Sequence, residues 1–230
     1  MRGELVGADL LRERLAEVRA RVDAAARVAG RRPGAVEVVL ATKYVPAERM
    51  GVLAEAGVRL VGENRAQDLL AKHTLHGQAF TWDFIGHLQS RKTRLVLPLV
   101  RLIHSVSSLS VVQELQRWAQ NTVTVLLEVN VAGEETKSGV APLEVDAFLD
   151  AASAYDKVSF GGLMCMPPLT PTEEEAAPYF AGLRELGERL SAVWAGRYTF
   201  AELSMGTSAD YEVAVREGAT KVRVGEAVLF

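Results

Sequence analysis

The sequence predicts a single (β/α)8 barrel of the TIM type, in the α/β class, with an extra helix at its N-terminus. Short apolar runs typical of buried parallel strands recur eight times along the chain. A helical pattern follows each of the first seven runs. Strands that alternate with helices form a parallel sheet, and eight such units close into a barrel. No Ser/Gly-rich linker divides the chain, so residues 1–230 are expected to form one domain.

Length and composition agree with this fold and exclude several classes of protein. The 230 residues are 49% hydrophobic, and a net charge of −3 gives no basic excess typical of nucleic-acid-binding proteins. No run approaches the length of a membrane span, and the N-terminal stretch carries scattered charges instead of a signal-peptide core. Cys165 is the single cysteine, so no internal disulfide is possible. We expect a cytoplasmic protein that binds neither membranes nor nucleic acids.

The first two elements follow from periodicity. Apolar residues recur at three- and four-residue steps over 8–30, which predicts an amphipathic helix with Asp9 as its cap and Gly30 at its end. The run 36–46, VEVVLATKYVP, is almost wholly apolar and predicts a strand covered on both faces. Pro46 breaks this strand and opens the next helix. In a closed ring the first helix lies beside the eighth strand, and we expect it to cover that strand.

The remaining elements alternate in the same way. Further strands are expected at 58–62, 81–86, 102–106, 123–131, 158–166, 200–205 and 221–225. Further helices are expected at 46–57, 66–73, 89–97, 108–120, 143–155, 173–194 and 211–217. Gly57, Pro98 and Gly218 mark helix ends. The loop PPLTPT after the sixth strand is expected to be a surface excursion and not a domain boundary.

Lys43 lies where the first strand is expected to end. The C-terminal rim of a barrel carries the chemistry, and a lysine there is a candidate amine nucleophile. A free lysine is protonated at neutral pH, so this one must be desolvated or lie near another cation to react with a carbonyl. A lone lysine at a strand end more commonly extends into solvent. This residue alone therefore leaves both interpretations open.

The turns after the seventh and eighth strands predict a phosphate site. The first contains Ser204, Gly206 and Ser208, and the second contains Gly225 and Glu226. These two loops often hold a phosphate in such barrels, because unpaired backbone N–H groups at a strand–helix turn can bind an oxyanion. An ordinary helix capped by Ser208 is the alternative. Two such turns, on the two strands where the fold predicts them, favour the phosphate.

Arg223 lies in the eighth strand on the same face as Gly225, because side chains two residues apart share a face. If that face lines the barrel mouth, Arg223 disfavours protonation of Lys43 and can donate to a ring nitrogen. A nucleophilic lysine, a phosphate turn and an inward arginine predict a phosphorylated aldehyde held as a Schiff base, and pyridoxal 5′-phosphate (PLP) fits. Other strand ends offer groups around such a ring, namely Asn64, His87, Asn130, Met164 and Met166.

The histidines allow more than one interpretation. His87 suits a helix cap or a core position as well as a position beside the ligand. The other histidines are scattered, and no set of them has metal-ligand spacing, so no metal is expected.

Six segments of the chain resemble one known family. ATKYVP, GENRAQ, WDFIGHLQSRK, LEVNVAGEETKSG, GLMCMPP and LSMGTSADYEVAVREGATKVRVG are similar to the pyridoxal phosphate homeostasis proteins, also called the PLP-binding barrel proteins or the YggS/PROSC family. The segments follow in order from the first strand to the chain end. The resemblance implies the fold of the N-terminal domain of bacterial alanine racemase, with PLP bound at the C-terminal rim of the barrel.

The resemblance also implies roles for individual residues. Lys43 matches the Schiff-base lysine, and Arg223 matches the arginine that faces the pyridine nitrogen. Ser208, with Ser204 and Gly206 nearby, matches the phosphate-binding turn; Gly225 and Glu226 match the last phosphate-binding backbone positions, and Asn64 matches a polar residue beside the cofactor. Two positions depart from the family pattern. Thr207 stands where Met is usual, and Glu226 stands where Thr or another short residue is common, which leaves the role of its side chain open.

The implied function is that of a PLP carrier or buffer in vitamin B6 and amino-acid homeostasis, without robust catalysis and with no catalytic residue assigned. Racemisation needs bases on both faces of the substrate α-carbon, or one base that reaches both. In the alanine racemases that this barrel resembles, the second base comes from a C-terminal β domain, which a chain ending at Phe230 is expected to lack. An arginine at the ring nitrogen also makes the ring a weaker electron sink. A PLP-dependent racemase or lyase and a phosphosugar enzyme are the alternatives. Apo PLP-dependent enzymes are the expected partners, and the expected state is a monomer.

Two further hypotheses concern side chains near the rim. Lys137, in the loop EETKSG, would hold PLP transiently on its way out, although a solvated loop lysine is the commoner case. Glu226 would serve the phosphate through its backbone N–H alone, because a phosphate dianion repels a carboxylate. Its side chain would then face solvent or a basic group such as Arg2 or Arg12.

Overall fold

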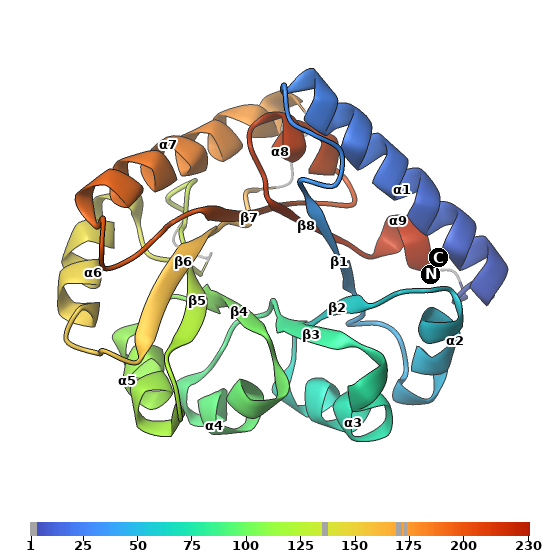
Figure 1. Cartoon of the computed structure of the whole chain (residues 1–230), viewed down its shortest axis with the longest axis horizontal. Helices are drawn as coiled ribbons and strands as arrows, with labels where there is room; N and C mark the ends of the chain where they lie inside the picture. The colour runs from blue at the N-terminus through green and yellow to red at the C-terminus, as the bar shows by residue number, and fades with distance from the viewer. Residues whose placement is uncertain (1–3, 135–137, 169–171, 173) are drawn as a thin grey trace.

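The structure of the protein is a computed structural model that describes residues 4–134, 138–168, 172 and 174–230. Eight parallel strands form a closed barrel in chain order, and β8 pairs with β1 to complete it. Figure 1 places the strands in the middle of the molecule and the helices in a ring around them. The predicted fold class, a (β/α)8 barrel with an extra N-terminal helix, is therefore confirmed.

The strands are short and covered on both faces. Every residue of β4 is buried, for example, which explains why the sequence shows apolar runs without clean alternation. The strands are β1 (Glu37–Ala41), β2 (Leu60–Glu63), β3 (Thr81–Phe84), β4 (Leu102–Val106), β5 (Val123–Glu128), β6 (Val158–Met164), β7 (Glu202–Thr207) and β8 (Lys221–Val224).

The helices cover the barrel from outside. They are α1 (Ala8–Val28), α2 (Met50–Glu55), α3 (Ala66–His76), α4 (Thr93–Val96), α5 (Leu109–Trp118), α6 (Val145–Ala152), α7 (Ala177–Val193), α8 (Tyr211–Arg216) and α9 (Glu226–Leu229). Helix α1 buries an apolar stripe and packs against α2, α8 and α9. Figure 1 shows it along the sector of β8 and β1, where the sequence predicts it.

Several predicted boundaries are wrong in informative ways. Strand β1 ends at Ala41, so Lys43 lies in the following turn. Strands β5 and β6 end earlier than predicted, and β7 begins and ends two residues later than predicted, because an apolar run does not mark where regular strand pairing begins and ends. A one-turn helix, α9, follows β8 where almost none was expected.

The predicted caps of the first helix had mixed outcomes. Asp9 does not cap α1, because it lies inside the first turn, where it pairs with Arg12 at 2.6 Å; the N-cap is Gly7. Gly30 has a φ of 70° and follows the C-cap, as expected for a glycine that ends a helix.

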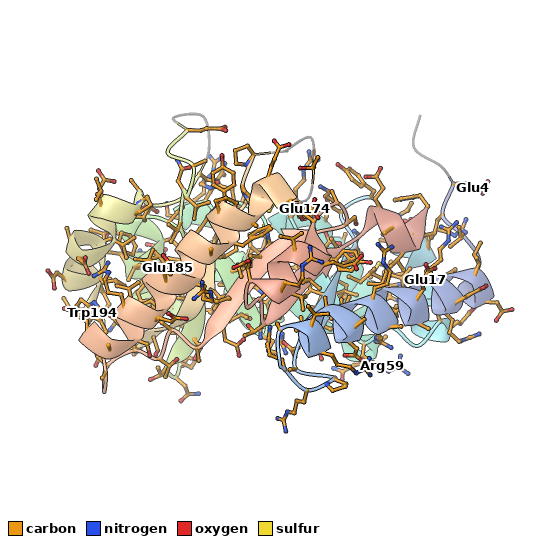
Figure 2. The ribbon with its side chains drawn as sticks, turned by 90° about the horizontal axis from the view of Figure 1, so that it is seen from above. Glu4, Glu17, Arg59, Glu174, Glu185 and Trp194 are labelled. Carbon is orange, nitrogen blue, oxygen red and sulfur yellow. The ribbon has the colours of Figure 1, made fainter. Side chains whose placement is uncertain are left out.

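Seen from the side in Figure 2, α7 carries the chain from one end of the barrel to the other. Glu174, just before α7, lies toward the upper edge of this view, and Trp194, just after it, lies toward the lower edge. The carboxyl ends of the strands therefore face the upper edge of this view. Among the described residues, no helix combines the length and apolar character needed to cross a bilayer.

Candidate functional site

A cavity of about 510 Å³ opens at the carboxyl ends of the strands. Its wall comes from β1, β2, β3, β5, β6, β7 and β8, from the loops that follow them, and from α9 with Phe230. Of the predicted site residues, Lys43, Asn64, Ser208, Arg223, Gly225 and Glu226 line the cavity, whereas Ser204 and Gly206 do not. The fold thus brings six separate positions of the sequence to one hollow.

Lys43 lies at the rim on a turn that is anchored from below. Its side chain is exposed, and its ammonium nitrogen lies 4.9 Å from the centre of the Tyr44 ring. The preceding residue, Thr42, is fully buried; its carbonyl accepts from Lys72 Nζ at 2.8 Å and its hydroxyl donates to Glu63. Lys72 and Glu63 also form a buried ion pair. The backbone below Lys43 is therefore fixed while the amine remains accessible.

Arg223 is buried beneath the cavity and lines its floor. Its Nη1 donates to the carbonyl and the hydroxyl oxygen of Ser204 at 2.7 and 2.6 Å, and its Nη2 donates to the carbonyl of Cys165 at 2.8 Å. The remaining contact of Nη2 is the sulfur of Met166 at 2.9 Å, a weak acceptor. Burial lowers the pKa of Arg223, but a guanidinium remains protonated at neutral pH. The cavity therefore has a fixed cation with one bond that a better acceptor can replace.

Ser204 and Gly206 shape the site from beneath. Ser204 is fully buried in β7, where it holds Arg223. Gly206 has a φ of 91°, and a Cβ there would lie 2.6 Å from the Cβ of Ala214 on α8. Only glycine lets the chain turn from β7 toward α8 at this distance.

Ser208 joins the turns after β7 and β8. Its Oγ accepts from the backbone N–H of Gly225 at 3.1 Å and of Ala227 at 3.4 Å. The alternative in which Ser208 caps the next helix is wrong, because the N-cap of α8 is Asp210. Asp210 also accepts from the backbone N–H and hydroxyl of Thr207, so the departure at Thr207 adds a contact within the turn.

Asn64 and Gly86 form the opposite wall. A Cβ at Gly86 would lie 2.1 Å from the carbonyl oxygen of Asn64, so the two turns touch there only because residue 86 is glycine. The side-chain oxygen of Asn64 is buried and has no hydrogen-bond partner among the described residues. A buried polar atom of this kind is expected to find a partner, and a ligand in the cavity can supply one.

Glu128 and Ser138 were not predicted, yet both line the cavity. Glu128 is only 5% exposed, and one of its carboxyl oxygens accepts from the Ser138 hydroxyl at 2.7 Å. Burial raises the pKa of Glu128, against the opposing effects of Ser138, His87 and Arg223. An acid within the apolar run VTVLLEV was the available sequence signal. His87 itself is exposed at the rim, so it is not a core histidine.

The other expectations about this rim are met only in part by described residues. Glu226 is exposed at the first turn of α9. Arg12, one of its expected partners, binds Asp9 and the carbonyl of Glu55, while Arg2 and Lys137 lie outside the described residues. Within the described ranges, no group of three or more His, Cys, Asp or Glu side chains has an arrangement suited to a metal ion.

Comparison with known proteins identifies relatives over nearly the whole chain. The profile of the family described as alanine racemase, N-terminal domain, matches residues 14–230. A pyridoxal phosphate homeostasis protein of Aquifex aeolicus (strain VF5) is 39% identical over 217 residues, 93% of this chain and 94% of the relative. One of Pseudomonas aeruginosa (strain PAO1) is 41% identical over 222 residues, 94% of this chain and 93% of the relative. The solved structure of PipY of Synechococcus elongatus PCC7942 with PLP bound has a TM-score of 0.82 and 32% identity, covering 96% of this chain and 100% of that one.

Proposed function

The chain belongs to the family of pyridoxal phosphate homeostasis proteins, and we propose that it binds PLP as a Schiff base on Lys43 and acts as a carrier or buffer of this cofactor. The observation that carries the proposal is the common cavity of Lys43, Arg223 and Ser208, which combines an accessible amine, a fixed cation and a turn with backbone donors. PLP supplies an aldehyde for the amine and an anionic phosphate. The side-chain oxygen of Asn64 in the same wall, which has no partner within the described ranges, also fits a polar ligand.

The remaining site residues divide between the two ends of the ligand. Arg223 donates a hydrogen bond to the ring nitrogen. The ring nitrogen replaces the Met166 sulfur, because this sulfur is the weakest acceptor that Arg223 has. Ser208 and the backbone N–H of Glu226 hold the phosphate, while Gly225 supports them through its own N–H, which donates to Ser208 Oγ at 3.1 Å, and Gly206 shapes the turn. Asn64 lies beside the cofactor. Ser204 acts from beneath, through Arg223.

The role we propose is delivery and storage without robust catalysis. A buried arginine at the ring nitrogen leaves that nitrogen unprotonated, and the ring then withdraws electrons less strongly than it does beside a carboxylate. Glu128 favours the alternative of a racemase or lyase, since a cavity carboxyl with a raised pKa is a candidate base. Incubation of the PLP-loaded protein with enantiopure alanine separates the two, because a steady loss of optical purity supports the enzyme.

We further propose that apo PLP-dependent enzymes receive the cofactor, and that the protein acts in the cytoplasm as a monomer. Transfer of PLP to a purified apo-enzyme, followed by recovery of that enzyme's activity, measures the first part. Size-exclusion chromatography with light scattering measures the second.

The decisive experiment is spectroscopic. The purified protein mixed with PLP is expected to show a visible absorbance band that borohydride removes, and mapping of the reduced protein is expected to place the cofactor on Lys43. Absence of a band, or attachment of PLP only to other lysines, would refute the Schiff-base proposal. A band would also argue against a phosphosugar enzyme on this barrel.

A further inference from the structure

A column of buried polar side chains runs through the barrel interior and ends at Arg223. Asp83 on β3, His104 on β4, Ser204 on β7 and Arg223 on β8 are each at most 5% exposed. His104 Nε2 lies 3.2 Å from Asp83 Oδ2, and its Nδ1 lies 2.8 Å from Ser204 Oγ. The same Oγ accepts from Arg223 Nη1 at 2.6 Å. The four side chains form one continuous chain, and of these four Arg223 lines the cavity.

Hydrogen-bonding capacity fixes the proton positions in this column. A guanidinium can only donate, so Ser204 Oγ is an acceptor toward Arg223. The single hydroxyl proton of Ser204 then goes to His104, whose Nδ1 must accept it. The neutral imidazole carries its own proton on Nε2 and donates it to Asp83. A protonated imidazole would donate on both sides and leave the Ser204 hydroxyl proton without an acceptor in the column.

The charges around the column also favour a neutral His104. Burial lowers the pKa of His104 most strongly; Asp83 opposes this effect, and Arg223 and Lys221 add to it. The groups that face the imidazole are Asp83 from β3, Ser204 from β7, and Arg223 and Lys221 from β8. Asp83 is itself held by two hydrogen bonds from Arg101, at 3.1 and 2.8 Å. A cationic imidazole would therefore add a third positive charge beside Arg223 and Lys221, both of which are buried.

An aspartate, a histidine and a serine in contact resemble a hydrolytic triad, but this column cannot act as one. Ser204 has no exposed surface, so no substrate reaches it. Its oxygen also accepts a charge-assisted hydrogen bond from Arg223, which reduces its nucleophilicity. The hydrogen bonds of the column hold the Arg223 guanidinium instead.

We propose that His104 is a positioning residue for the cavity, and that it acts through the Ser204 hydroxyl to hold the Arg223 guanidinium in the orientation that meets the ligand. His104 Nδ1 accepts the hydroxyl proton of Ser204. A lone pair of the Ser204 oxygen therefore stays available to accept from Arg223. Nη1 donates to Ser204 on β7 and Nη2 donates to Cys165 directly after β6, and these bonds fix the plane of the guanidinium. The inference rests on the proposed function for the identity of the ligand, and not for the arrangement of the column.

The proton positions can be tested without any ligand. In nitrogen-15 NMR spectra of the histidine-labelled apo-protein, assigned by comparison with His104→Gln, His104 is expected to show the Nε2–H tautomer. It is also expected to remain neutral around pH 6.5, where a free histidine titrates. A His104 that titrates there, or that carries its proton on Nδ1, would overturn the inference. This measurement is independent of PLP binding.

Variants then test the effect on the ligand. Ser204→Ala and His104→Gln are expected to weaken PLP binding about tenfold, the effect of losing one charge-assisted hydrogen bond. They should also change the pH dependence of the absorbance of bound PLP, which a purely structural role would leave unchanged. Ser204→Thr retains the hydroxyl and is expected to restore both properties. His73→Gln serves as a matched control, because His73 packs on Trp82 outside the column.

The outcomes separate the two proposals. A folded Ser204→Ala protein with the affinity and spectrum of the wild type would refute the positioning role while leaving the proposed function intact. A wild-type protein that shows no PLP band would refute the proposed function, and the NMR result would still decide the state of His104. If Ser204→Ala fails to fold, the wild-type NMR measurement remains the test.

Discussion

Lys43 and Lys72 lie close to the same backbone turn, and their environments differ completely. Lys72 is 4% exposed and its ammonium is held by the Thr42 carbonyl and by Glu63, whereas Lys43 is exposed at the cavity rim. A buried lysine that is paired and hydrogen-bonded is occupied by structure. The exposed lysine is the one that remains accessible to an aldehyde, which supports its role in the proposed function.

Replacing Lys43 should remove the covalent chemistry without harming the fold. In Lys43→Ala the visible band of bound PLP is expected to disappear, while the melting temperature changes by no more than a few degrees, because an exposed side chain contributes little to stability. Absorbance and circular dichroism measure the two effects. Lys92→Ala, at a lysine outside the cavity, is the matched control and should retain the band. Covalent PLP on another lysine of Lys43→Ala after reduction would contradict the assignment.

The Glu226 side chain should be dispensable for PLP binding. A carboxylate about 4 Å from a phosphate charge costs on the order of 1 kcal/mol in water, and more in a partly dry site. Glu226→Thr keeps the backbone donor, so PLP affinity should stay the same or increase slightly, as measured by fluorescence titration. A large loss of affinity would show that the carboxylate has a direct role, and a crystal structure with the carboxylate directed into the phosphate turn would refute the geometry.

At the scale of elements, the turn from β7 to α8 depends on Gly206. Its φ of 91° would strain any residue with a side chain. A Cβ added at this position would also clash with the Cβ of Ala214. Gly206→Ala is therefore expected to lower the free energy of unfolding by roughly 1–3 kcal/mol. The phosphate turn should be displaced at the same time, so PLP affinity should fall in parallel.

A second glycine provides the matched control for this prediction. Gly182 lies inside α7 at a helical φ, and a Cβ there would meet no atom within 4 Å. Gly182→Ala is expected to increase the free energy of unfolding by about 0.5–1 kcal/mol, because alanine favours the helix. Urea denaturation measures both variants. Equal effects of the two substitutions would contradict the special role of Gly206.

At the scale of the whole molecule, one end of the barrel binds the ligand in the proposed function and the other end contributes to stability. The carboxyl ends of the strands form the cavity, and the amino ends are joined by ion pairs. Glu37 on β1 pairs with Arg101 at 3.0 Å and with Lys221 on β8 at 2.9 Å, and Lys221 also pairs with Glu202 on β7 at 2.8 Å. The pairs of Glu37 connect β1 with residues far away in the sequence, and one partner, Arg101, also binds Asp83 in the interior. The ion pairs at the amino ends of the strands therefore stabilise the closed barrel, whose carboxyl ends form the cavity.

This network predicts the acid stability of the protein. Burial alone would raise the pKa of Glu37, but Arg101 and Lys221 outweigh it and lower the pKa to about 2. A depressed pKa in the folded state gives stability that is complete above the unfolded value of about 4.5 and is lost as the pH falls toward 2. Glu37→Gln should therefore flatten the decrease of melting temperature over this range. Glu48→Gln, at an exposed glutamate, should leave it unchanged, and an equal effect of both substitutions would contradict the assignment.

Most of the fold and of the rim could be predicted from the sequence, because both depend on local patterns. Apolar runs and helical periodicity give eight strands and their helices, and the position of a residue at a strand end places it at one edge of a parallel barrel. Lys43, Asn64, Ser208, Arg223, Gly225 and Glu226 reach the cavity for this reason. The strand boundaries could not be predicted as well, because an apolar run does not mark where regular strand pairing begins and ends.

What only the tertiary structure decided is which side chains face each other across the barrel. Ser204 was predicted at the phosphate turn, but β7 places it beneath Arg223, where it links that residue to His104. Glu128 was read as part of an apolar strand, but the closed barrel buries it in the cavity wall beside Ser138. Sequence patterns report the face of each strand on its own. Closure of eight twisted strands sets the register and the distances between faces, and these distances determine hydrogen bonds and pKa values.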